Sequence, residues 1–166
     1  VMKEDARCML ENKADGIAFG CLNQDGSINE KQTKEMIDII KEYQGEVVFH
    51  RAFDCVADPY ASIELLIHLG VDRILTSGLK PKAMDGKELI KDLQNKYGNQ
   101  IEILAGSGIN ASNARKMMED TGIYQVHVKI GSMIQQLKRM KFHMPMHLRL
   151  MKMIMMLFQK NLLKKL

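Results

Sequence analysis

The sequence predicts an α/β fold with parallel strands, built as part of a (β/α)₈ barrel (a partial TIM barrel) with about five strand–helix units. Short apolar runs rich in β-branched or aromatic residues recur along the chain, and their starts lie about 23 to 30 residues apart, the length of one βα unit. The segments between them place apolar residues on one helical face, as Met36, Ile39, Ile40 and Tyr43 do. Alternating strands and helices of this kind form a parallel sheet through right-handed crossovers.

Each element can be placed from its own signals. Residues 1–12 are expected to form a helix that leads into the first strand. Asp58, which is followed by proline, is a typical helix N-cap, and Gly70 stands where that helix ends. Asn110 and Gly122 bracket the fourth connecting helix in the same way. Buried strands are predicted at five segments, namely 16–22, 46–50, 72–76, 101–105 and 124–128.

Two architectures fit this order, a doubly wound open sheet and a (β/α)₈ barrel. An open sheet concentrates its site at one switch point, whereas a barrel draws site residues from many strand ends. Polar or glycine residues gather at the C-terminal end of every predicted strand: Gly20, His50–Arg51, Thr76–Gly78, Gly106–Gly108 and His127. The barrel is therefore favoured, with only five of its eight strands represented. Unpaired strand edges then predict aggregation or a homo-oligomer unless another chain covers them.

The composition indicates a globular body followed by a C-terminal segment of different charge. A chain of 166 residues suits one domain. The net charge is +4, but residues 131–166 carry eight basic and no acidic side chains, so the first 130 residues hold 16 basic and 20 acidic ones. A mildly acidic body predicts no nucleic-acid partner. The chain lacks a membrane-length apolar run, a secretory start and a cysteine framework, so we expect a soluble, cytoplasmic protein without a membrane partner.

The run from Phe49 to Asp54 places an imidazole, a guanidinium and a carboxylate just beyond a predicted buried strand. His50 can act as an acid or base, Arg51 can hold an anion, and Asp54 can orient either of them. These three residues are therefore candidate catalytic residues. The alternative is a structural ion pair between Arg51 and Asp54 beside a hydrogen-bonded histidine.

Two further strand ends carry candidate ligand contacts. The glycine turn at 106–108 follows a strand and is predicted to open a helix, so its backbone N–H groups can bind an anion at the positive helix end. The alternative is a plain glycine turn. Hydroxyl groups and another glycine follow the strand at 72–76. The candidate ligand-binding residues are Thr76, Ser77, Gly78, Gly106, Ser107 and Gly108.

His127 supplies a second imidazole at the rim and is a further catalytic candidate. Together with His50 and Cys21 it would suit a copper ion, because thiolate and imidazole are ligands that copper accepts. The alternative is that Cys21, and equally Cys55, is simply a small hydrophobic side chain. The sequence therefore assigns no metal-ligand set.

Several runs together resemble the CutC family. They are 14–22 with 25–29, then 48–54, which is the most specific, 74–78, and 126–127. The resemblance covers roughly residues 1–129. It implies the barrel fold and a cytoplasmic protein of copper homeostasis, with a copper ion or a small anion as candidate ligand and no particular reaction.

The chain departs from the family pattern in two places within this resemblance. The family's three earlier strands and an Arg-Pro-Arg-Gly-Gly motif have no counterpart, so site residues from that part cannot be carried over. Ser107 also interrupts what the family pattern would make a run of glycines.

Residues 130–166 form a basic tail that holds eight of the 14 methionines and does not resemble a domain. One interpretation is an amphipathic helix for a membrane or partner, interrupted by Pro145. The other is a frameshift. Methionine has the single codon ATG, whose final G can begin a shifted codon, so that Met-Ile becomes Asp and Met-Lys becomes Glu. Read in the shifted frame, the segment regains the acidic residues that residues 131–166 lack. We therefore predict a frameshift near codon 130.

The leading functional prediction is a CutC-type copper homeostasis protein whose mechanism is unassigned. The alternative is a barrel enzyme that acts on a small phosphorylated or carboxylated metabolite. In that case the glycine turn and Arg51 hold the anion while His50 transfers protons. A third interpretation is a membrane or nucleic-acid binder driven by the tail.

Overall fold

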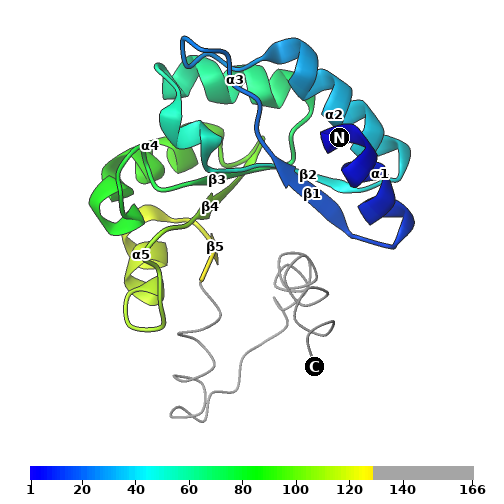
Figure 1. The fold of residues 1–166 in the computed structure, drawn as a ribbon. Helices are drawn as coiled ribbons and strands as arrows, with labels where there is room; N and C mark the ends of the chain where they lie inside the picture. Colours follow the sequence, from blue (N-terminus) through cyan, green and yellow to red (C-terminus); the bar gives the residue numbers. More distant parts are fainter. Residues whose placement is uncertain (129–166) are drawn as a thin grey trace.

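Five parallel strands lie in one sheet in the order in which they occur in the chain (Figure 1). The structure, a computed structural model, describes residues 1–128. The strands are β1 (Gly16–Phe19), β2 (Glu46–Phe49), β3 (Arg73–Thr76), β4 (Glu102–Ala105) and β5 (Gln125–Val126). All five lie within the predicted strand segments. Cys21 and Leu22 were included in the first predicted strand but lie beyond β1, where Leu22 forms an isolated antiparallel bridge with Ile28.

Helix α1 precedes the first strand, the later helices connect successive strands, and all of them lie around one side of the curved sheet (Figure 1). They are α1 (Met2–Glu11), α2 (Glu30–Glu42), α3 (Pro59–Leu69), α4 (Lys87–Tyr97) and α5 (Ala114–Thr121), with short 3₁₀ helices η1 (Arg51–Cys55) and η2 (Ala83–Gly86). Among residues 1–128, no helix combines the length and apolar character that crossing a membrane requires. The predicted amphipathic or frameshifted tail lies outside the described residues.

The helix-boundary signals of α3 act as predicted. Asp58 Oδ1 accepts hydrogen bonds from the backbone N–H groups of Tyr60 at 2.9 Å and Ala61 at 3.1 Å, which satisfies two groups that a helix start leaves unpaired. Gly70 ends the helix with φ of 89°, in the left-handed region that glycine adopts without strain.

The start of α5 was predicted too early. Asn110 does not cap the helix directly, because its side-chain oxygen accepts from the N–H of Ser112 at 2.9 Å and forms a turn. The helix begins four residues later, at Ala114. Its predicted end at Gly122 is confirmed, with φ of 77°.

The two faces of the sheet carry different side chains, because successive residues of a strand point to opposite faces. One face packs its apolar residues against the helices and forms the core, with Phe49 and Ile74 fully buried. We call the opposite face the inner face. Its middle layer is apolar and contains Ala18, Val48, Leu75 and Leu104.

A polar cluster occupies the inner face at the amino ends of the strands. Arg73, only 3% exposed, donates to Glu102 through Nε at 2.6 Å and to Glu46 through Nη1 at 3.2 Å. Gln125 donates to the same Glu102 carboxylate at 2.9 Å. Burial raises the pKa of Glu102, but the hydrogen bonds from Gln125 and Arg73 outweigh burial, so the pKa lies below its ordinary value. A hollow of about 640 Å³ opens at the amino ends of the strands. In a (β/α)₈ barrel, residues at this end contribute to stability, whereas active sites lie at the carboxyl ends.

Candidate functional site

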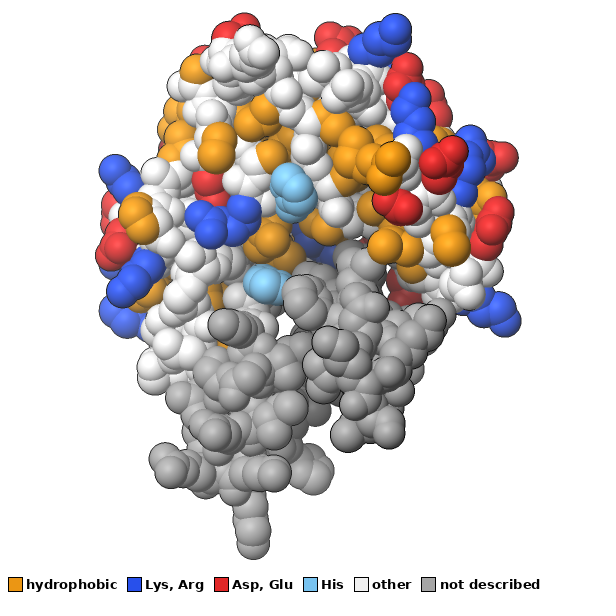
Figure 2. Space-filling model, viewed as in Figure 1, with side chains coloured by type: hydrophobic (Ala, Val, Ile, Leu, Met, Phe, Trp, Pro, Cys, Tyr) orange, Lys and Arg blue, Asp and Glu red, His pale blue; other side chains and the backbone are white. Residues whose placement is uncertain are grey.

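The candidate residues gather where the strands end, in the segments that directly follow β1 to β5, which we call the rim. Backbone hydrogen bonds extend the strand pairing into these segments. The N–H of His50 donates to Phe19 at 2.7 Å, and the N–H of His127 donates to Ala105 at 2.7 Å. Figure 2 shows histidine side chains at the surface in the view of Figure 1, with hydrophobic side chains around them. The predicted site residues therefore belong to one edge of the sheet, although they do not all touch one another.

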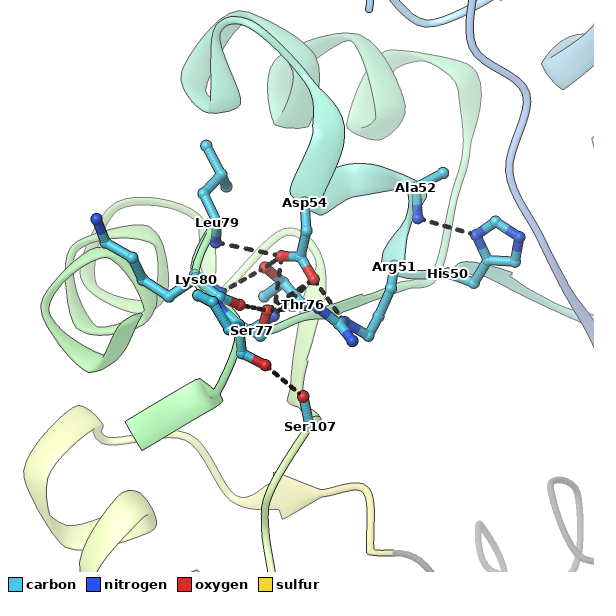
Figure 3. A network of polar contacts seen from close by, with 11 residues as sticks. His50, Arg51, Ala52, Asp54, Thr76, Ser77, Leu79, Lys80 and Ser107 are labelled. Carbon is cyan, nitrogen blue, oxygen red and sulfur yellow. Dashed lines mark hydrogen bonds and ion pairs between the residues drawn. The ribbon is translucent and has the colours of Figure 1, made fainter. Parts of the chain in front are cut away.

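The Asp54 carboxylate is the centre of a hydrogen-bond network between η1 and the loop after β3 (Figure 3). It accepts from the Thr76 hydroxyl at 2.6 Å, from the Ser77 N–H at 2.9 Å and from the Leu79 N–H at 3.2 Å. Arg51 donates to it through Nε at 2.7 Å. Burial of Asp54 raises its pKa, but the donors from Thr76, Arg51 and Ser77 outweigh burial and hold the pKa below its ordinary value.

Arg51 is held by two partners and still reaches solvent. Its Nη2 donates to Ser77 Oγ at 3.0 Å, in addition to the bond from Nε to Asp54. The Arg51 side chain is 44% exposed, whereas that of Asp54 is 6% exposed. Within residues 1–128, Nη1 of Arg51 donates to no protein acceptor. The guanidinium is therefore fixed in direction with one nitrogen open to a ligand.

His50 is held by its neighbour in the chain and takes no part in the Asp54 network. Its Nδ1 accepts a hydrogen bond from the N–H of Ala52 at 3.0 Å, and its ring lies apart from Asp54 in Figure 3. Burial lowers the pKa of His50, so the ring is neutral at neutral pH. Asp54 thus orients Arg51 and not His50. The alternative drawn from the sequence, an ion pair beside a hydrogen-bonded histidine, describes this geometry.

Polar groups at the end of β3 and directly after it hold the loop that follows this strand. The Thr76 hydroxyl accepts from the Gly78 N–H at 2.9 Å and donates to Asp54. The Ser77 hydroxyl lies 2.9 Å from Asp54 Oδ2 and also meets the carbonyl oxygen of Lys80. The N–H of Leu79 joins the same network, and sequence reasoning missed it because its φ of 59° and its partner depend on the folded loop.

The glycine turn at 106–108 adjoins the loop after β3. Ser107 donates from its hydroxyl to the carbonyl of Pro81 at 2.7 Å, and its own carbonyl accepts from the N–H of Ala83 at 3.0 Å. Among the described residues, the backbone N–H groups of Ser107 and Gly108 donate to no protein acceptor. The turn does not open a helix, contrary to the prediction, because α5 begins only at Ala114. Any anion here would therefore meet turn N–H groups rather than a helix end.

His127 lies at the far side of the rim, beside Gly106. A Cβ built on Gly106 would lie 3.6 Å from His127 Nδ1, which is ordinary van der Waals contact. Burial lowers the pKa of His127, so this imidazole is also neutral at neutral pH. His50 follows β2 and His127 follows β5, so two strands, β3 and β4, lie between them in the sheet.

The described residues fit a copper ion poorly. Within residues 1–128, no group of three or more His, Cys, Asp or Glu residues is placed to hold a metal ion. Cys21 is 5% exposed, and burial raises the pKa of its thiol, which disfavours the thiolate that copper would bind. Cys8 and Cys55 are exposed free thiols on other elements.

Comparison with known proteins gives one consistent family. The model of the CutC family matches residues 1–132. A CutC family protein of Treponema denticola is 43% identical over 126 residues, which cover 76% of this chain and 50% of the relative. The mouse copper homeostasis protein cutC homolog is 38% identical over 132 residues, which cover 80% and 48%. The chain thus spans about half the length of the curated relatives it matches.

Solved structures agree on the fold. The crystal structure of CutC from Streptococcus agalactiae superposes with a TM-score of 0.71 at 30% identity and covers 76% of this chain and 61% of that chain. A native KDPGal structure gives a TM-score of 0.56 at 13% identity, with 78% and 53% covered, and supports the fold alone. The predicted partial (β/α)₈ barrel is confirmed.

Proposed function

The chain belongs to the CutC family, and on that premise we propose that it serves in copper homeostasis through a rim site that binds a small anion. Because the chain spans about half of its curated relatives, this proposal concerns the part of the site that β2, β3 and β4 provide. We further propose that it acts in the cytoplasm, since its three cysteines are free thiols and thiols persist in a reducing compartment.

The observation that favours an anionic ligand is the way in which Asp54 and Ser77 hold the Arg51 guanidinium. Its Nε and Nη2 are fixed by Asp54 and Ser77, the side chain is 44% exposed, and among residues 1–128 no acceptor pairs with Nη1. A guanidinium with one free edge matches the oxygen atoms of a phosphate or a carboxylate. The N–H groups of the 106–108 turn lie on the neighbouring strand end, because the register pairs Thr76 with Ala105. These groups are all donors, which suits an acceptor-rich ligand.

Inorganic phosphate and acetate, added separately to the chain, test this proposal by thermal shift and calorimetry. We expect either anion to stabilise the wild type, and Arg51→Ala to weaken binding about tenfold or more, because a hydrogen bond to a charged group contributes about 1.5–3 kcal/mol. Arg7→Ala is the matched control. Arg7 is also 44% exposed and also pairs with one carboxylate, that of Glu42 on α2. It lies on α1, away from the rim.

Copper itself provides the opposing arm of the experiment. The proposal fails if neither anion changes the thermal unfolding of the chain while copper(I), titrated against a chromogenic chelator, binds with an affinity that His50→Gln or His127→Gln abolishes. Direct copper binding through the rim histidines would then replace the anion site.

A barrel enzyme acting on a phosphorylated or carboxylated metabolite is the second candidate, and His127 is the observation that favours it. The His127 ring is neutral and half-buried, and within residues 1–128 its side chain makes no hydrogen bond. It is therefore better placed to accept a proton than His50, whose Nδ1 is occupied. Turnover of a carboxylated or phosphorylated metabolite that is lost in His127→Gln would support this candidate. Binding without turnover would favour a purely binding role.

A further inference from the structure

Gly20 and His50 are neighbours at the ends of β1 and β2. The register pairs Phe19 with Phe49, so the next residue of each strand also lies side by side, and His50 donates its backbone N–H to Phe19 at 2.7 Å. Residues at matching positions of adjacent strands point to the same face of a sheet. The His50 ring therefore extends across the inner face over the position of Gly20.

The His50 ring occupies the space that a side chain at Gly20 would need. A Cβ built on Gly20 would lie 2.7 Å from Cε1 of His50, 2.7 Å from Nδ1 of the same ring and 2.7 Å from Cβ of Ala52. Carbon atoms in proteins do not approach so closely without displacement. The φ of Gly20 is not in the left-handed region. Glycine is needed here for space and not for backbone conformation.

The same ring atom is fixed by a hydrogen bond. Nδ1 of His50 accepts from the N–H of Ala52 at 3.0 Å, which requires a lone pair on Nδ1. A neutral imidazole carries its single proton on the other nitrogen when Nδ1 is an acceptor. His50 therefore presents an N–H donor at Nε2, on the side of the ring turned away from Ala52 (Figure 3).

We infer that Gly20 and the Ala52 N–H fix His50 as a hydrogen-bond donor of the rim, with Nε2–H directed to an oxygen acceptor of the ligand. The ligand class is the small oxyanion of the proposed function, on which this inference rests. The fixed tautomer leaves no lone pair at Nε2, so a metal cation can bind there only after the Ala52 bond is broken. A neutral N–H donor can stabilise negative charge on a ligand oxygen without exchanging a proton.

Gly106 and His127 repeat this arrangement in a looser form. The register pairs Ala105 with Val126, so Gly106 and His127 also lie side by side. A Cβ at Gly106 would lie 3.4 Å from His127 Cβ and 3.6 Å from its Nδ1, and the tightest approach is 2.6 Å to the flexible end of Leu75. The ring of His127 is therefore less dependent on its glycine, and a methyl group at position 106 should move it less.

Nitrogen-15 histidine spectra of the full chain test the tautomer directly. We expect the two-bond couplings of His50 at neutral pH to show a protonated Nε2 and a bare Nδ1. A protonated Nδ1 overturns the inference. Titration with inorganic phosphate should then shift the Nε2–H resonance. If the tautomer is as stated but phosphate has no effect at His50 or Arg51, the proposed anion function fails while the fixed tautomer stands.

Gly20→Ala tests the role of the glycine. The methyl group collides with Nδ1, so we expect the Ala52 bond to break, the two tautomers to mix, and the pKa of His50 to rise toward its ordinary value as the ring moves into solvent. Phosphate affinity should fall at least threefold. Gly106→Ala should change His127 less. Unchanged couplings and pKa at His50 in a folded Gly20→Ala chain overturn the positioning role.

Two further variants keep the experiment decisive. Gly45→Ala is the control, because its added Cβ meets Ile40 and Leu10 at 3.0 Å at the opposite end of β2 and should leave the His50 spectrum unchanged. Should Gly20→Ala fail to fold, Gly20→Ala with Ala52→Gly removes the clash between the two methyl groups and leaves the imidazole to move. A native His50 spectrum in that double variant also overturns the role of Gly20.

Discussion

Replacing Asp54 by alanine is expected to destabilise the chain more than any other single change at the rim. The Asp54 carboxylate is 6% exposed and accepts from Thr76, from the N–H groups of Ser77 and Leu79, and from Arg51. Alanine leaves these donors without an acceptor. Because Arg51 is 44% exposed and can return to water, most of the loss comes from the other donors and not from the ion pair.

The expected loss is about 3–5 kcal/mol of the free energy of unfolding. A buried donor left without a partner costs about 1–3 kcal/mol, and three such donors that relax partly toward water give this range. Removing one partner of a buried charged network costs a similar amount. Since domains are stable by about 5–15 kcal/mol, the variant should retain only a fraction of its stability.

Urea unfolding measures this loss. With a slope of about 2 kcal/mol per molar urea, the midpoint should fall by about 2 M in Asp54→Ala. Asp38→Ala is the control, because Asp38 is 60% exposed and, within the described part of the chain, pairs with Lys34 alone, one helical turn away, a contact that contributes about 0.5 kcal/mol or less. Amide exchange should also quicken at Ser77 and Leu79. Equal midpoints for the two variants would refute the reasoning, as would unchanged exchange at those two amides.

The pH dependence of Asp54 has a definite sign. Its pKa in the folded chain lies below the ordinary value of 3.8, because the donors outweigh burial. The carboxylate therefore contributes stability that is complete above the unfolded pKa and is lost as pH falls through the folded pKa. Urea midpoints of the wild type and Asp54→Asn should differ most near neutral pH, approach each other as pH falls below about 3.8, and converge below the folded pKa of Asp54. A difference that grows with acidification would show that the sign is wrong.

Three further substitutions test the stability of the helix and strand that support the rim, α3 and β3. Asp58→Ala removes the cap of α3 and should cost about 1 kcal/mol in urea unfolding; a neutral effect would mean that water replaces the cap. Gly70→Ala meets no atom within 4 Å, so the measured loss, about 1–2 kcal/mol, should equal the strain of a left-handed alanine alone. Arg73→Ala should cost about 2–4 kcal/mol and raise the pKa of Glu102 in a carboxyl NMR titration. A pKa of Glu102 that stays low would exclude Arg73 as its cause.

The strands and most helix boundaries could be predicted because their signals are local. Each strand is a short apolar run, and Asp58 and Gly70 mark the ends of α3 through chemistry that involves only adjacent residues. The start of α5 was missed because Asn110 is equally suited to a turn, and its contact with Ser112 decides between the two. Local sequence does not distinguish those outcomes.

The sequence predicted which residues lie at the rim but not which of their side chains contact one another. His50, Arg51 and Asp54 are close together in the sequence, which suggests a single unit, yet Asp54 pairs with residues more than twenty positions away, at the end of β3 and in the loop that follows it. Which neighbour the carboxylate orients depends on how η1 packs against that strand. The Arg73 cluster was missed for the same reason, since its carboxylates come from two other strands.

The network around Asp54 also determines how much side-chain entropy Arg51 loses when a ligand binds. An arginine that moves freely loses up to about 2 kcal/mol of side-chain entropy when it becomes ordered. Arg51 has already lost much of that freedom during folding, because Asp54 and Ser77 restrain its guanidinium. Binding to the wild type should therefore carry a small entropic penalty. In a chain without Asp54 the same contact with the ligand would form, but calorimetry should show the deficit mainly as entropy rather than enthalpy.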